Sequence, residues 1–152
     1  ETPDNISSNN SSVTLYHTTH ANFNTKIINI SGDNEEYFML ENIGHDGYQA
    51  GLDYLIGGND NTSGIAIWHI DENQSGNSDY THKLVDLEEA SNAGLDLGSH
   101  NGKQTNLFFN GNKTEFSDST NPNSKTYLGN SSDITINNIS EAGDSMTFDV
   151  NF

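Results

Sequence analysis

The sequence predicts an all-β fold, an antiparallel β-sandwich of jelly-roll-like type with long, turn-rich loops. Short apolar segments alternate with period two, and turn formers (Gly, Asn and Asp) separate them every 8–12 residues or so. No segment shows three turns of helical periodicity. We expect a flexible, polar N-terminal segment over residues 1–11 and a single sandwich domain over residues 12–152.

The expected strands are distributed along the whole chain. The segment Glu35–Ile43 is apolar on both faces at its centre, which predicts a strand in the interior of a sheet. Residues 44–63 hold many turn formers and are expected to form a long excursion, and residues 140–144 are expected to close a C-terminal hairpin. The expected strands are 13–17, 26–30, 35–43, 64–70, 107–109, 114–116, 134–139 and 146–152. Residues 84–90 alternate like a strand through Leu87, although their charges would also suit a helical turn.

The charge balance excludes several classes of partner. The chain of 152 residues contains 22 Asp and Glu against five Lys and no Arg, for a net charge of −17. So few cations cannot neutralise a phosphate backbone, so we expect no nucleic-acid partner. No apolar run approaches the ~18 residues that a membrane span needs, so we expect no membrane insertion.

The chain has no cysteine and a thin apolar core, with 31% hydrophobic residues. Disulfides, thiolate nucleophiles and cysteine metal sites are therefore excluded. A small domain without disulfides is often stabilised by a metal, and calcium prefers the carboxylate and amide oxygens in which this chain is rich. The alternative is that the acidity serves only solubility in a salty, cold or marine setting.

One loop has the ligand spacing of a calcium site. Oxygen-bearing side chains stand at relative positions 1, 3, 5 and 9, and Gly76 stands at position 6. His82 replaces the closing Glu at position 12 and no helices flank the loop, so it is not an EF-hand. The alternative is a solvated hairpin loop. The expected metal ligands are Asp71, Asn73, Ser75, Asn77 through its carbonyl, and Asp79, with Asp86, Glu88 or Glu89 closing the shell.

We expect no zinc to be bound in this segment. The string H-E-x-x-H does not occur, and the rings of His17 and His20 should point to opposite faces of a strand end. A three-ligand site from His69, Asp71 and His82 is conceivable, but we expect His69 to be a hydrogen-bonded residue at a strand end.

No constellation predicts catalysis by this chain. The nucleophile elbow G-x-S-x-G is absent, and the adjacent carboxylate pairs Glu35–Glu36 and Glu88–Glu89 should point apart on a strand. The aromatic residues Trp68, Tyr48, Tyr54, Tyr80 and Tyr127 could form a platform that stacks on sugar rings. The apolar neighbours of Trp68 favour a core role for it instead.

Several segments, taken in order, resemble a known family. They read EYFMLEN at 36–42, GYQAGL at 47–52, GIAIWHIDE at 64–72 and HKLVDLEEA at 82–90, followed by SDITI at 132–136 and SMTFDV at 145–150. This ordered set is similar to the region downstream of the catalytic helix in secreted, zincin-like metallopeptidases of the immune inhibitor A type. The resemblance covers roughly residues 25–152, with 53–63 and 73–80 as local elaborations.

The resemblance implies a non-catalytic, calcium-associated accessory β-domain of an extracellular bacterial protein, packed against a neighbouring protease domain. In that family the H-E-x-x-H motif lies upstream of the matching region, so the resemblance transfers no catalytic residue to this chain. One alternative is an extracellular carbohydrate- or protein-binding module of a surface assembly. Another is a hydrolase active by itself, for which we expect no turnover.

Overall fold

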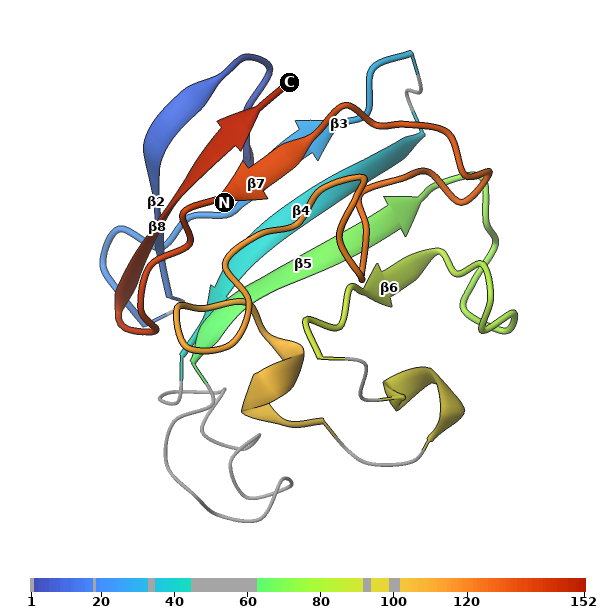
Figure 1. Ribbon diagram of the computed structural model, residues 1–152. Helices are drawn as coiled ribbons and strands as arrows, with labels where there is room; N and C mark the ends of the chain where they lie inside the picture. Colours follow the sequence, from blue (N-terminus) through green and yellow to red (C-terminus); the bar gives the residue numbers. More distant parts are fainter. Residues whose placement is uncertain (1, 18, 33–34, 45–62, 92–93, 99–101) are drawn as a thin grey trace.

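The strands of this protein form two sheets. The computed structural model describes residues 2–17, 19–32, 35–44, 63–91, 94–98 and 102–152 (Figure 1). One sheet has five strands in the order β1-β3-β4-β5-β6, and the other has three in the order β2-β8-β7. The strands are β1 (Asp4–Asn5), β2 (Asn10–Tyr16), β3 (Lys26–Asn29), β4 (Glu36–Ile43), β5 (Gly64–Asp71), β6 (Val85–Leu87), β7 (Thr135–Asn137) and β8 (Ser145–Asn151).

The predicted fold class is confirmed, because the described chain is almost entirely β and its sheets are almost entirely antiparallel. Only β1 pairs in parallel, with β3. Helical structure in the described residues comprises the short 3₁₀ turns η2 (Leu95–Leu97) and η3 (Gln104–Asn106). Neither is long and apolar enough to cross a bilayer, and the same holds for every helix among the described residues.

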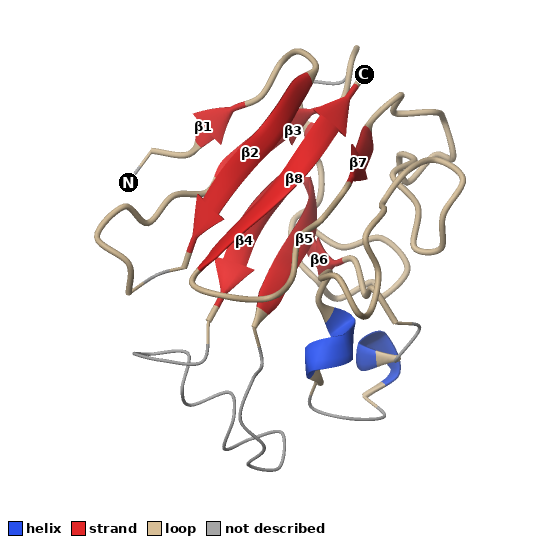
Figure 2. Cartoon of the chain, turned by 60° about the vertical axis from the view of Figure 1, so that its left-hand side comes forward, coloured by secondary structure: helices blue, strands red, loops and turns tan. Residues whose placement is uncertain are grey.

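The hydrophobic core lies between the two sheets. Figure 2 shows β2 and β8 passing in front of β4 and β5. Burial alternates along β4 and β8, as period-two patterning requires when one face of a strand points inward. Phe116 packs edge-to-face on Phe38, with ring centroids 5.2 Å apart, and on Phe108 at 5.8 Å. These rings fill the space between the sheets that the aliphatic side chains leave.

A second, smaller apolar cluster covers part of the outer face of the five-stranded sheet. Ile43, Ala66 and Leu107 are buried there, with Trp68 and Leu87 partly buried against them. Ala66 and Trp68 point outward because they alternate with the core residues of β5. Trp68, for which a core role is expected, is partly buried in this outer cluster and does not belong to the main core between the sheets.

The observed strands follow the order of the predicted ones, but two predicted strands are reduced to bridges, β6 and β7 are short, and β1 is additional. Residues 107–109 and 114–116 contribute isolated bridges, Ile65 to Phe108 and Phe116 to Ile136, instead of full strands. The predicted excursion lies almost wholly outside the described residues. β4 is the central strand of its sheet, and β7 pairs with β8 as the predicted hairpin.

The start of the sandwich also differs from the predicted boundary at residue 12. β1 pairs with β3, and Ile6 is buried in the core although the residues around it are polar. Polar composition predicts a frayed terminus, but one buried isoleucine and a strand pairing join this part of the chain to the sandwich.

Replacement of Gly64 by alanine should lower the free energy of unfolding by about 1–3 kcal/mol, a typical cost of overpacking. An ideal Cβ at Gly64 would lie 2.7 Å from the Cβ of Leu107 and 3.3 Å from the carbonyl oxygen of Phe108, so the bridge at the start of β5 must shift. Urea unfolding of Gly64→Ala measures the loss. Gly76→Ala is the matched control, because its Cβ would meet no atom within 4 Å. Equal stability of both variants would contradict the packing described here.

Candidate functional site

The most elaborate polar site lies on the inner face of the five-stranded sheet, at the end where β4 begins and β5 ends. Strand register brings the side chains together: Glu36 lies opposite Asp71, and Phe38 lies opposite His69. On the other side of β5, His69 lies opposite Asp86 of β6. Directly opposite residues in an antiparallel pair share one face, so one end of the core contains several ionisable groups. We call Glu36, His69, Asp71, His82, Glu88 and Tyr127 the His69 cluster.

His69 is held between two carboxylates. Its side chain is 3% exposed, its Nε2 lies 2.8 Å from Oε1 of Glu36, and its Nδ1 lies 3.0 Å from Oε1 of Glu88. Both ring nitrogens can donate at once only in the imidazolium form. Burial opposes that charge, but the hydrogen bonds and charges of Glu88 and Glu36 outweigh burial and raise the pKa of His69. In its imidazolium form the ring neutralises part of the buried negative charge.

Burial acts in the opposite sense on Glu88. It raises the pKa of the Glu88 carboxyl, and the charges of Asp86 and Asp96 act in the same direction, while the bond to His69 opposes the rise. Glu88 follows β6 directly, and its N–H donates to the carbonyl oxygen of Ile67 at 2.9 Å. The side chain of Glu88 therefore attaches the end of β6 to the core through one charged hydrogen bond.

Tyr127 closes the cluster from the segment between η3 and β7, drawn in orange over β4 and β5 in Figure 1. Its ring stacks on His69 with centroids 4.4 Å apart and on His82 with centroids 4.1 Å apart. Its backbone N–H donates to Oε1 of Glu36 at 2.7 Å. Burial, followed by the charges of Asp86 and Glu88, raises the pKa of the Tyr127 phenol. The ring is therefore a neutral spacer between two imidazoles.

His82 and Asp71 form the outer part of the cluster. Nε2 of His82 lies 2.6 Å from Oδ2 of Asp71, and the N–H of Asn73 donates to Oδ1 of Asp71 at 2.9 Å. Burial opposes ionisation of Asp71, but the hydrogen bonds from Asn73 and His82 prevail and lower its pKa. This pair joins the loop after β5 to the sheet.

The cluster joins several segments of the chain. Both ring nitrogens of His69 are bonded to carboxylates, one from Glu36 and one from Glu88. The ring of Tyr127 separates His69 from His82, so the conceivable zinc site of His69, Asp71 and His82 is not assembled. The expectation that His69 is a hydrogen-bonded residue near a strand end is confirmed.

The loop residues predicted to bind calcium have separate protein partners. The carboxylate of Asp71 binds His82. The side-chain amide of Asn77 bonds both backbone groups of Val85, at 3.0 Å each. Oδ1 of Asp79 accepts from the N–H of Thr81 at 2.9 Å and from its hydroxyl at 2.6 Å. Asn73 and Ser75 are exposed in the same loop.

The predicted closing ligands also have separate partners. Asp86 accepts from Nζ of Lys83 at 2.6 Å, Glu88 binds His69, and Glu89 accepts from the N–H groups of Gly94 and Leu95 at 2.9 and 2.7 Å. Across the described residues, no group of three or more His, Asp or Glu side chains is arranged to hold a metal ion. As placed here, the eight residues do not fit one coordination shell, and the calcium site stays a prediction.

The aromatic residues considered for sugar stacking lie in different environments. Trp68 belongs to the outer cluster, Tyr127 is stacked between two imidazoles, and Tyr80 is 59% exposed. Tyr48 and Tyr54 lie outside the described residues. Among the described residues, a row of exposed rings is therefore not formed.

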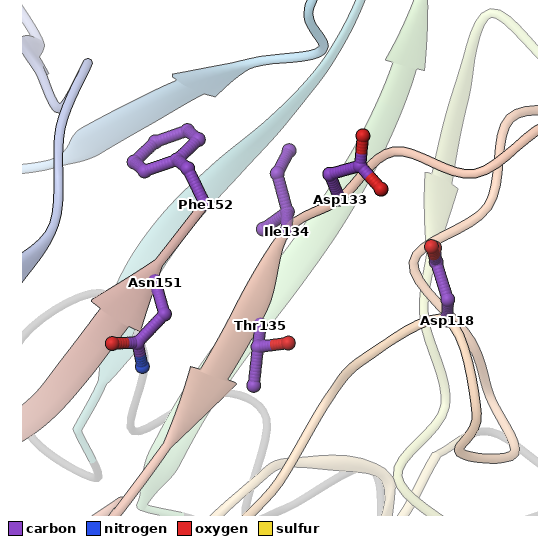
Figure 3. Close-up of a pocket in the computed structure, with 6 residues that line it drawn as sticks. All are labelled: Asp118, Asp133, Ile134, Thr135, Asn151 and Phe152. Atoms are coloured by element: carbon purple, nitrogen blue, oxygen red, sulfur yellow. The ribbon is translucent and has the colours of Figure 1, made fainter.

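A separate, shallow pocket of about 520 Å³ lies at the end of the three-stranded sheet (Figure 3). Figure 3 shows its lining side chains running from Phe152 and Asn151 at the end of β8 across to Asp133 and Asp118. The carboxylate of Asp118 accepts from the hydroxyls of Ser124 and Ser131, and these bonds outweigh burial and lower its pKa. The polar groups of this pocket therefore stabilise the 117–133 segment itself.

Sequence reasoning did not anticipate Glu36 and Tyr127 as partners of His69. The sequence did contain a signal for Glu36: it is a carboxylate at the start of one apolar strand, and His69 lies near the end of the next one. Tyr127 lies in a polar, turn-rich segment that carries no periodicity.

Comparison of the chain with models of protein families, with curated proteins and with solved structures finds no match.

Replacement of Glu88 by glutamine should lower the pKa of His69 and reduce the free energy of unfolding by about 2 kcal/mol near pH 6. The folded state holds the His69 proton more tightly than the unfolded chain does. The stabilisation is therefore fully present below the ordinary histidine pKa of about 6.5 and is lost as the pH rises through the higher folded value. The stability difference between wild type and Glu88→Gln should thus shrink from pH 6 to pH 9.

Urea unfolding across that range and NMR titration of the His69 ring measure the two effects. Glu141→Gln, an exposed change in the 140–144 turn, serves as the control and should alter neither. A difference between wild type and Glu88→Gln that stays constant from pH 6 to pH 9 would show that His69 carries no proton-dependent bond to Glu88.

Proposed function

We propose that this chain is a non-catalytic accessory β-domain of a secreted bacterial metallopeptidase-like protein, which stabilises or targets the neighbouring protease domain. The observation that carries the proposal is where the family-like segments lie. EYFMLEN, GIAIWHIDE and HKLVDLEEA contain the three adjacent strands β4, β5 and β6. Their polar residues Glu36, His69 and Glu88 meet at the centre of the His69 cluster.

The chemistry of the cluster supports a non-catalytic role. Its central imidazole is 3% exposed and bonded on both nitrogens, so the shared residues contribute to folding instead of to a reacting site. If the residues that resemble the family serve only the fold, the domain would act through its surfaces and through the stability that it provides. The loop after β5, which carries the elaboration at 73–80, is then free to differ between proteins.

The reading frame that encodes this chain is expected to encode H-E-x-x-H upstream of residue 1. The isolated chain with added zinc should show no turnover of casein, whereas the whole parent protein should. In the parent, Glu88→Gln should lower the temperature of thermal inactivation and leave kcat/KM at 20 °C within about twofold, because a folded domain of this kind does not touch the substrate. A reading frame without the motif, or turnover by the isolated chain, would contradict the proposal.

Calcium stabilisation is part of the same proposal and rests on the spacing of the Asp71–Asp79 loop. Because the carboxylates of Asp71 and Asp79 hold protein partners in this structure, calcium binding would have to exchange some of these bonds for bonds to the ion. An ion that binds only the folded chain stabilises it by ~2.7 kcal/mol at a hundred times its dissociation constant.

The melting temperature in calcium should therefore exceed that in chelator by several degrees. Asp79→Asn should remove most of that gain, whereas Asp133→Asn, another exposed carboxylate outside the loop, should keep it. Identical melting temperatures with calcium and with chelator would remove calcium from the proposal. The accessory role would still be tested by the reading frame and by the casein assay of the parent protein.

A further inference from the structure

The outer edge of β6 combines an open sheet edge, exposed apolar side chains and an acidic rim. β6 is the last strand of the five-stranded sheet, and Figure 1 shows η2 below it. A groove of about 360 Å³ follows this edge, with Tyr80, Val85, Leu87, Glu89, Leu95 and Asp96 among its lining residues.

Two residues of β6 point their backbone N–H and C=O groups toward the groove. The N–H of Asp71 donates to the carbonyl oxygen of Leu84 at 3.1 Å, and the N–H of Glu88 donates to that of Ile67 at 2.9 Å. Bonded and non-bonded residues alternate in an antiparallel pair, so the N–H and C=O groups of Val85 and Leu87 point away from β5. These groups are what another strand would bond.

The two residues differ in how their outward groups are satisfied. The Asn77 side chain donates its amide N–H to the oxygen of Val85 and accepts from the N–H of Val85, as the backbone of a neighbouring strand would. No described residue forms a corresponding pair with the outward groups of Leu87. The edge is therefore closed at Val85 and open at Leu87.

The side chains around the open position give the chemistry of the partner. Tyr80 and Val85 are 59% and 37% exposed, and few other large apolar side chains in the described chain are exposed. The rim carries Asp86, Glu89 and Asp96 against Lys83, which pairs with both aspartates. Negative charge thus remains in excess beside an apolar surface, in a chain of net charge −17.

We propose that the β6 edge is a docking site for a short, extended, basic and apolar segment of a partner protein, which pairs with the backbone of Leu87 and packs on Tyr80 and Val85. Lysine or arginine side chains of that segment meet Glu89 and Asp96. A second copy of this chain fits poorly, because two chains of charge −17 repel each other. The proposal goes beyond the accessory role and does not depend on calcium or on the parent protein.

The test uses the 152-residue chain and a fluorescein-labelled heptapeptide of alternating lysine and valine, titrated by anisotropy at 0.15 M salt. We expect saturable binding of this peptide and at least about tenfold weaker binding of the same peptide with glutamate in place of lysine. Methylation of alternate backbone nitrogens should abolish binding for one of the two possible sets of nitrogens, because only one edge of the peptide faces Leu87.

Matched variants separate docking from general attraction to an acidic protein. Asp96→Lys and Glu141→Lys change the net charge equally at exposed positions, and only Asp96→Lys should weaken binding, by about tenfold. Tyr80→Ser should weaken binding similarly, whereas Leu128→Ser, at a side chain that is 84% exposed elsewhere, should not. In the unmodified chain, the amide NMR signals of Val85 and Leu87 should shift on titration.

Several results would overturn the proposal. These are equal effects of Asp96→Lys and Glu141→Lys, equal binding of the acidic peptide, unchanged binding of both methylated peptides, or NMR shifts that exclude β6. Sedimentation showing a dimer that Tyr80→Ser dissociates would assign the edge to a second copy of the chain instead.

Discussion

His69 lies inside the β-sandwich with each of its ring nitrogens bonded to a carboxylate from a different segment of the chain. Glu36 begins β4 and Glu88 follows β6, so the charge of one ring on β5 joins three strands at one end of the sheet. An isolated buried charge would be too costly to persist, whereas a charge bonded on both sides is tolerated. The segment that carries Tyr127 then shields the ion pair from water.

The excess of negative charge is accommodated in part by hydrogen bonds to the chain itself. Glu89 accepts the backbone N–H groups of Gly94 and Leu95 at the start of η2. Asp149 accepts from the amide of Asn138 and from the N–H of Ser12, and these bonds lower the pKa of Asp149. Bonds of this kind fix loops in a chain that has no disulfides. They are a physical alternative to the metal that the composition suggests.

Periodicity was sufficient to predict the strands that are buried on one or both faces. β4, β5 and β8 alternate or are apolar throughout, and their burial follows that pattern. The cluster could not be predicted in the same way, because its bonds depend on register between strands far apart in the sequence and on a loop residue, Tyr127. Spacing alone also cannot distinguish a metal ligand from a side chain that bonds the backbone. Asp79 fits the calcium pattern, yet its carboxylate accepts from the backbone N–H and the hydroxyl of Thr81 in this structure.

The inner and outer sides of β6 are connected through its backbone. Glu88 bonds His69 on the inner side and so holds the end of a strand that is only three residues long. Alternate residues of an antiparallel strand present their backbone groups to opposite edges. When the backbone N–H and C=O of Glu88 face β5, those of Leu87 must therefore face solvent. The side chain of Asn77 bonds the outward backbone groups of Val85 and so holds Val85 in an extended conformation. It leaves the outward backbone groups of Leu87 uncovered. The buried ion pair therefore sets the geometry of the edge that faces the groove, although none of its atoms reaches that surface.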